Sequence, residues 1–410
     1  MNTIVNPYKM YLKLCTFLMI IISSDTLDLF KEGGAREQGV AGRAIEYTGP
    51  INYIIPSWLM MSAPILVILL IKELKRMKAR ELNLVPVSFL ALSFLSIAWA
   101  DDKYVMFRTA LLIFFAYALI FIQVRTFTIK QNIYFLSNVL LGMQVFSLLM
   151  ILFVPSYGIA VGEEHAGKWQ GMFNHKNTLG SFSVIAYCIF IGRLKIKYSL
   201  GPVVGALLSV ALALGSQSFT AVGAIALSTV IFILFGYRKA LKVAFTFRRA
   251  ILITTLLISG FMVFIAVANI NSIGVFGKDT SFTGRNLIWG YLLVQTLKSP
   301  VVGHGLSDLP TRLASSTGSA DFQNSVGFIV GTAHNGFIEA IYALGVLGVI
   351  YIYCFLSKMV VFSKPQINFM LNLTLLMGIV IINTFESKFF SFNSVFIIML
   401  FAIEMNYRKV

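Results

Sequence analysis

Residues 104–124 read YVMFRTALLIFFAYALIFIQV, a stretch in which Arg108 is the only charged side chain. A run of about 20 apolar residues is long enough to cross the hydrocarbon core of a bilayer as a single helix. Similar runs recur along the whole chain. The sequence therefore predicts an integral membrane protein built from helices.

The composition points to the same class of protein. Of the 410 residues, 58% are hydrophobic and only 12% are charged. This charged fraction is about half of that in an ordinary soluble domain. Because no polar stretch is long enough to enclose a core of its own, we expect one polytopic membrane domain over residues 1–410.

The hydropathy pattern predicts an all-α fold with about twelve membrane spans. The longest polar interval, residues 271–335, should form a long outer loop between spans 9 and 10. Within it, residues 286–297 are apolar enough for an interfacial helix, which Pro300 keeps short. The spans are expected near residues 13–30, 51–71, 84–99, 104–124, 133–154, 177–192, 200–215, 219–235, 250–270, 336–356, 369–382 and 389–405.

The net charge of +16 is distributed as an orientation signal. Short basic clusters at residues 72–80, 193–197 and 238–249 separate the apolar runs, which is the positive-inside pattern and not a continuous basic groove for nucleic acid. Both termini are therefore expected in the cytoplasm. The polar loop at 271–335 is then expected on the outer side of the membrane.

No metal or cofactor is expected. The three cysteines lie in apolar runs without disulfide or zinc spacing, and the four histidines form no metal-ligand motif. The sequence also contains no glycine-rich phosphate loop.

Two residues mark the ends of the polar loop. Arg285 falls in the first turn of the expected interfacial helix, where a cation together with free N–H groups forms a pocket for an anion such as phosphate. The alternative is an arginine that reaches lipid headgroups. His334 precedes the tenth span, and a helix N-terminus favours a neutral imidazole that can act as a general base. The alternative is a polar helix cap. Asn335 directly follows His334 in the sequence, and Glu339 lies just over one helical turn further on.

A second polar group, His175, Lys176 and Asn177, directly precedes span 6. These side chains could bind phosphate or sugar hydroxyls, and the alternative is capping with headgroup contact. Arg108 would lie slightly inside the bilayer, where an unpaired charge costs about 2.5 kcal/mol or more. We therefore expect Arg108 to face the bundle, a wet cavity or a phosphate.

Five ordered blocks resemble the O-antigen ligase and polysaccharide polymerase family of bacterial inner membranes. The resemblance covers the chain from about Leu92 to its end. The blocks are LSFLSIAWADD with the following Arg108, WQGMFNHKNTLG, TGRNLIW, AHNGFIEAIYALGVLG and NTFESKFFSFN.

The resemblance implies a metal-independent, inverting glycosyltransferase that acts on the periplasmic side of the inner membrane. Its donor and acceptor would be glycans linked to undecaprenyl pyrophosphate. The implied roles are His334 as base or acceptor-orienting group and Arg285 as pyrophosphate ligand, with Lys176 and Arg108 as supporting cations. The residues that would orient donor or acceptor are Asn335, Glu339, His175 and Asn177. A chain-length regulator is a candidate partner.

One position departs from the family pattern. The turn between spans 7 and 8 commonly carries a basic residue after serine, but this chain reads GSQSFTAV, with Gln217 and Phe219. Either another residue supplies that cation, or this chain holds its donor differently. The blocks look closer to a polymerase of lipid-linked repeat units than to an O-antigen ligase, which would differ in its acceptor. A transporter of lipid-linked glycans is the alternative from another class.

Overall fold

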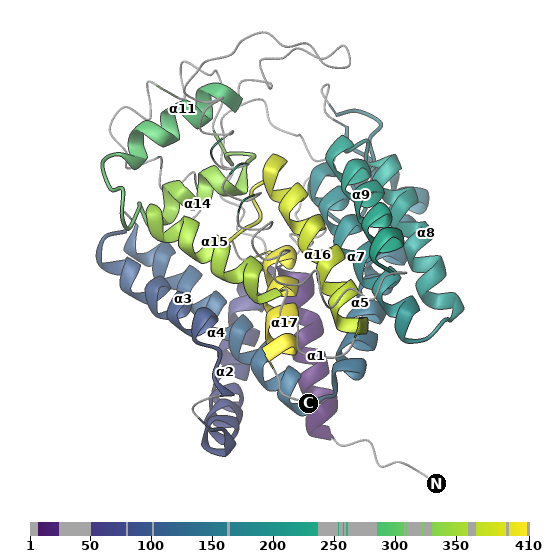
Figure 1. Ribbon diagram of the computed structural model, residues 1–410, viewed down its shortest axis with the longest axis horizontal. Helices are drawn as coiled ribbons and strands as arrows, with labels where there is room; N and C mark the ends of the chain where they lie inside the picture. The colour runs from purple at the N-terminus through teal and green to yellow at the C-terminus, as the bar shows by residue number, and fades with distance from the viewer. Residues whose placement is uncertain are drawn as a thin grey trace.

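The computed structural model describes residues 7–23, 51–78, 81–100, 102–161, 165–236, 285–306, 330–359, 366–390 and 393–407, together with residues 253, 257, 260, 309, 313 and 322. This part of the chain is helical, apart from connecting segments and one isolated bridge between Ile159 and Trp169 (Figure 1). The elements are α1 (Pro7–Ile22), α2 (Ile51–Arg76), α3 (Leu84–Leu95), the 3₁₀ turn η3 (Ser96–Ala98), α4 (Lys103–Thr126), α5 (Ile129–Phe153), α6 (Pro155–Gly158), α7 (Lys176–Ile196), α8 (Leu200–Gly215), α9 (Phe219–Gly236), α11 (Arg285–Thr296), α14 (Gly336–Leu344), α15 (Val346–Met359), α16 (Gln366–Phe385) and α17 (Ser394–Tyr407).

Most expected spans correspond to observed helices. Among the described residues, α4, α5 and α7 are long and apolar enough to cross a membrane, and several shorter helices are equally apolar. The ninth expected span, residues 250–270, and the loop from residue 271 to 284 lie outside the described residues, except for residues 253, 257 and 260. The count of twelve spans and the extent of the periplasmic loop therefore stay predictions.

The expected tenth span is wrong as a single helix. The chain breaks at Gly345, where φ is +59°, so that α14 and α15 are separate helices packed against each other. The segment that follows α11 occupies the break, because Val346 N–H donates to the Pro300 carbonyl over 2.8 Å. A Cβ at position 345 would lie 2.4 Å from the same oxygen, so glycine is required here. Hydropathy could not detect this break, since the run is apolar on both sides of Gly345.

The expected interfacial helix is present as α11, but its apolar face is used for protein packing. Ile288, Trp289 and Leu292 are buried in a small separate core together with Ile338 and Tyr342 of α14. This packing fixes the start of α11 relative to the start of α14.

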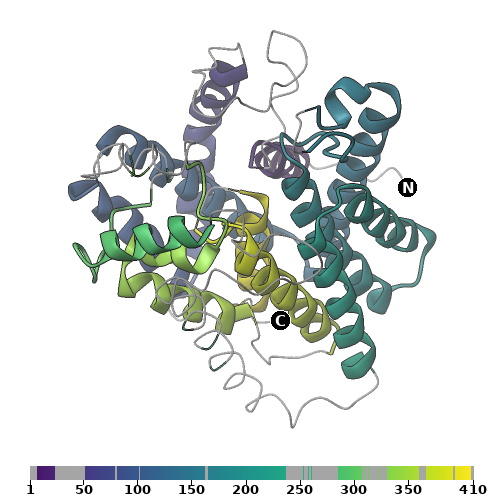
Figure 2. The ribbon, with the colours of Figure 1, turned by 90° about the horizontal axis from the view of Figure 1, so that it is seen from above.

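Figures 1 and 2 show α16 and α17 between two groups of helices. On one side lie α3, α11, α14 and α15, and on the other α7, α8 and α9. Helix α16 contacts α7 and α9 on one side and α14 and α15 on the other. The residues that directly follow α16 therefore lie where the two groups of helices meet.

Close helix packing depends on small residues at a few crossings. A Cβ at Gly192 of α7 would lie 2.5 Å from the Leu371 side chain of α16, and one at Gly205 of α8 would lie 2.5 Å from the Phe190 ring. Small residues let helix backbones approach closely when no hydrophobic effect drives association in lipid. Helix α7 is accordingly buried over its whole length from Leu179 to Gly192.

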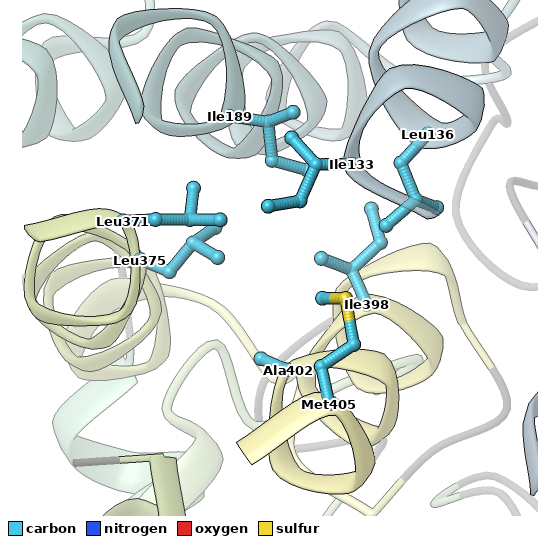
Figure 3. Close-up of a pocket in the computed structure, with 8 residues that line it drawn as sticks. All are labelled: Ile133, Leu136, Ile189, Leu371, Leu375, Ile398, Ala402 and Met405. Carbon is cyan, nitrogen blue, oxygen red and sulfur yellow. The ribbon is translucent and has the colours of Figure 1, made fainter. Parts of the chain in front are cut away.

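An apolar and nearly closed gap lies between four helices of the bundle. Figure 3 shows side chains of α5, α7, α16 and α17 that face a common gap, among them Ile133, Ile189, Leu371 and Ile398. The gap has a volume of about 10 Å³ and no polar lining. Since a cavity of that size without polar partners does not hold water, this region forms a dry core below the polar residues described next.

Candidate functional site

The ends of three segments meet around the carboxylate of Glu386. Glu386 directly follows α16, and its Oε1 accepts a hydrogen bond of 2.7 Å from Asn177 Nδ2 in the first turn of α7. Its Oε2 lies 3.6 Å from His334 Nδ1, two residues before α14 begins. The carboxylate therefore joins the start of α7 to the start of α14.

His334 has an unusual backbone conformation that its neighbours maintain. Its φ of +48° lies in the left-handed region, which is uncommon for a residue other than glycine. The His334 N–H donates to Thr332 Oγ1 over 2.9 Å. On the preceding residue, the Ala333 N–H donates to Glu339 and the Ala333 carbonyl accepts from Trp289 Nε1 over 2.7 Å. Strain of this kind persists only where the surroundings fix it, and it is concentrated at functional sites.

The imidazole of His334 faces the Glu386 carboxylate on one side, at 3.6 Å from Nδ1, and is partly exposed. Its side chain is 33% exposed, whereas that of Glu386 is 12% exposed. With Nδ1 directed at the carboxylate, Nε2 is the nitrogen left for a proton-donating substrate group; this tautomer is inferred from the contact.

Asn335 and Glu339 hold the start of α14 in place. Asn335 Oδ1 accepts from the backbone N–H groups of Phe337 and Ile338, and its Nδ2 donates to the Thr384 carbonyl over 3.1 Å. Asn335 is fully buried, and its own N–H donates to Ser387 Oγ. These bonds tie α14 to the end of α16, so both predicted residues support the backbone of His334. Their direct contact with donor or acceptor stays a prediction.

The predicted group before span 6 caps α7. His175 Nδ1 accepts from the Asn177 N–H over 3.1 Å, and the His165 ring lies edge-on at 5.2 Å between centroids. The pKa of His175 is lowered to about 4, mainly by burial; Glu386 opposes this shift, and His165, Lys176 and His334 reinforce it. His175 is therefore neutral at physiological pH, which its role as a cap acceptor requires. Lys176 is the first residue of α7 and lies between His175 and Asn177.

Arg285 lies beside Glu386, as the first residue of α11. Its Nη1 donates to the Phe385 carbonyl over 3.3 Å. Burial lowers the pKa of the Arg285 guanidinium, and the negative charge of Glu386 opposes that shift. The two residues that mark the ends of the predicted loop are thus brought to the same carboxylate.

The balance of charge at this site is positive. Burial by itself raises the pKa of Glu386, but His334, Lys388 and Arg285 outweigh it and hold the pKa below its usual value. Glu386 is thus ionised at neutral pH. Three cations (Arg285, Lys388 and Lys176) against two carboxylates (Glu386 and Glu339) leave a formal charge of +1, which suits an anion.

Sequence reasoning did not assign Glu386 or Lys388 to the site. Both lie in the NTFESKFFSFN block, with Glu386 209 residues from Asn177, and only the fold brings them together. Arg108 is exposed on α4, and in the described part of the chain no hydrogen bond or ion pair joins it to Glu386 or its neighbours. Its expected role as a supporting cation stays a prediction.

The α8–α9 turn, where the family's basic residue is missing, lies beside the start of α7. A Cβ at Gly180 of α7 would lie 2.8 Å from the Ser218 side chain. Gln217 is exposed in this turn with a φ of +50°. Within the described ranges, no group of three or more His, Cys, Asp or Glu residues could hold a metal ion.

Comparison with known families finds a match to part of the chain. A family model described as O-antigen ligase matches residues 204–353, which run from α8 into α15 and include Arg285, His334, Asn335 and Glu339. None of the curated proteins matches the chain. The match covers only part of the chain, and it confirms the predicted resemblance to this family.

Proposed function

We propose that this protein is a membrane glycosyltransferase that moves a glycan from a polyprenyl pyrophosphate carrier to a hydroxyl group of its acceptor. One observation supports this most: His334 contacts the carboxylate of Glu386 beside Arg285, at the junction of α7, α14 and α16. A histidine held by a carboxylate and surrounded by excess positive charge combines a general base with an anion site.

In the proposed reaction the acceptor hydroxyl attacks the anomeric carbon from the side opposite the pyrophosphate. A new bond forms between the hydroxyl oxygen and the anomeric carbon while the bond to the pyrophosphate oxygen breaks. The hydroxyl proton passes to His334 Nε2, and Glu386 stabilises the resulting imidazolium through Nδ1. The bond electrons leave with the lipid pyrophosphate, whose charge Arg285 and Lys176 stabilise. Lys388 is a further candidate for this role, since it already acts electrostatically on Glu386.

The orientation in the membrane follows from the basic end of the bundle. Lys13 lies 5.0 Å over the Phe127 ring, and Arg193 donates to Asn138, so the start of α1 and the end of α7 share one end. The site at the start of α7 is then at the other end. By the positive-inside pattern we assign the basic end to the cytoplasm of a bacterial inner membrane and the site to the periplasm.

The acceptor is proposed to be a second lipid-linked glycan, which makes the protein a polymerase of repeat units. The O-antigen ligase description of the matching family model favours the second candidate, transfer to lipid A-core. The two candidates share the chemistry described above and differ only in the acceptor.

Gel banding of surface glycan from a strain that lacks the gene tests these alternatives. Loss of a polymerase should leave single repeat units on the acceptor, whereas loss of a ligase should remove every capped form. A transporter would instead leave full-length substrate on the cytoplasmic side, and that result would overturn the proposal. Complementation with the wild-type gene is the control.

A further inference from the structure

A second polar groove lies at the basic end of the bundle, opposite the proposed active site. It is open, has a volume of about 420 Å³, and lies between α1 and α5. Helix α1 packs mainly on α4, so α1 and α5 flank the groove instead of closing it. The lining side chains used here are Lys13 and Phe17 of α1 and Gln131, Tyr134, Phe135 and Asn138 of α5.

The polar and the aromatic lining side chains lie at different depths along the groove. Both helices begin at the basic end, since Lys13 lies 5.0 Å over the ring of Phe127, two residues before α5 starts. Lys13 and Gln131 therefore lie nearer that end, and Phe17 and Phe135 lie one helical turn deeper. Asn138 lies one turn beyond Tyr134, and its Oδ1 accepts a hydrogen bond from Arg193. A polar mouth above two phenylalanine rings matches a lipid whose headgroup stays at the interface.

The mouth is suited to an anion. Among the described residues, its lining contains the ammonium of Lys13 and no carboxylate. Gln131 uses its Oε1 as an acceptor from the Thr128 N–H, which leaves its amide nitrogen as a donor. Tyr134 contributes a hydroxyl, so the mouth presents three kinds of hydrogen-bond donor.

A second cation stands directly behind the groove. Arg193 of α7 lies 4.6 Å over the Tyr134 ring and donates to Asn138 Oδ1 over 2.9 Å. These contacts keep the guanidinium next to the lining without filling the groove. Two cations and no carboxylate among the described lining residues favour a headgroup with a net negative charge over a zwitterionic one, and basic pockets between membrane helices bind anionic lipids in this way.

We propose that this groove binds an anionic phospholipid of the cytoplasmic leaflet, with its phosphate at Lys13, Gln131 and Tyr134 and an acyl chain against Phe17 and Phe135. The site is separate from the proposed glycan site and does not depend on the transfer reaction. Bound lipid would bridge α1 to α5 and stabilise the end of the bundle where the two helices do not pack on each other.

Native mass spectrometry of the full chain in neutral detergent tests this proposal. Phosphatidylglycerol and phosphatidylcholine are titrated against the wild type, Lys13→Gln and Lys9→Gln. Lys9 is a matched control, because it lies on the same helix, is exposed and also sits over the Phe127 ring, but does not line the groove. We expect phosphatidylglycerol to bind more tightly than phosphatidylcholine, and Lys13→Gln to weaken it about fivefold relative to Lys9→Gln.

Three results would overturn the proposal. The first is equal binding of the two lipids, and the second is equal effects of Lys13→Gln and Lys9→Gln. The third is displacement of phosphatidylglycerol by soluble glycerol phosphate at the same phosphorus concentration, because a headgroup alone would then suffice. If the groove holds a second copy of the chain instead, Lys13→Gln should dissociate dimers without changing the lipid adducts, which also contradicts the proposal.

Discussion

Replacement of Glu386 by glutamine isolates the electrostatic part of the proposed mechanism. The glutamine side chain would keep the volume of the carboxylate and can still accept the hydrogen bond from Asn177, but it removes the negative charge 3.6 Å from His334 Nδ1. At that distance the attraction between an imidazolium and a carboxylate is about 1 kcal/mol in water and about 5 kcal/mol at an effective dielectric constant of about 20.

The partial exposure of His334 places the expected effect between these limits. Since the imidazolium forms only as the proton is transferred, the loss should appear in the rate of transfer and not in substrate binding. We expect Glu386→Gln to slow glycan transfer by about 10- to 1000-fold.

The assay measures the initial rate of transfer by the purified chain in vesicles that contain the lipid-linked glycan. Protein amount and thermal midpoint are recorded for every variant. Glu73→Gln is the control, because Glu73 pairs over 3.4 Å with the exposed Arg76 on α2, where loss of a pair has little effect. A Glu386→Gln variant that transfers glycan at the wild-type rate would refute the assignment of Glu386 to the reaction.

Three further predictions concern the structure around the site. The folded state holds the pKa of His175 near 4, below its usual 6.5, so unfolded chains bind more protons between those values and stability should fall as the pH falls from about 6.5 towards 4. His175→Asn keeps a capping side chain but does not titrate, so its thermal midpoint should fall less than that of the wild type between pH 7.5 and 5.5. Equal falls in the two proteins would contradict this. Gly345→Ala should lower the thermal midpoint by the equivalent of more than about 1 kcal/mol, whereas Gly142→Ala on the open face of α5 should not. An unchanged thermal midpoint of Gly345→Ala would show that the break between α14 and α15 tolerates a side chain. Trp289→Phe should reduce glycan transfer more than Trp99→Phe in the same vesicle assay, because Trp289 Nε1 donates a hydrogen bond to the Ala333 carbonyl, directly before His334. Equal activities of the two variants would show that this hydrogen bond does not position the histidine.

The helices themselves were largely predictable from hydropathy and capping residues. Helix α8 has the expected bounds, and α11 begins within one residue of its predicted start. The break at Gly345 was not predictable, because it depends on a backbone conformation and on the docking of Pro300, neither of which changes the apolar pattern.

The candidate site was predictable only in part. Arg285, His334 and Asn177 were selected because cations and polar groups are rare at helix starts on the outer side. The Glu386 carboxylate that joins them was not predictable, because its partners are remote in sequence. Its own sequence neighbours indicate only the end of a helix. Arg108 shows the opposite case: its charge within an apolar run predicts that it faces the bundle, a wet cavity or a phosphate, but on α4 it is exposed.

The measurement that tests the central claim most directly is glycan transfer by His334→Ala in the same vesicle assay. The account predicts no long-chain glycan from this variant, with protein level, membrane insertion and thermal midpoint unchanged. His304→Phe is the matched control, because it keeps the ring that stacks on Tyr342 and lies outside the proposed site. Long-chain glycan from His334→Ala at the wild-type rate would contradict the account.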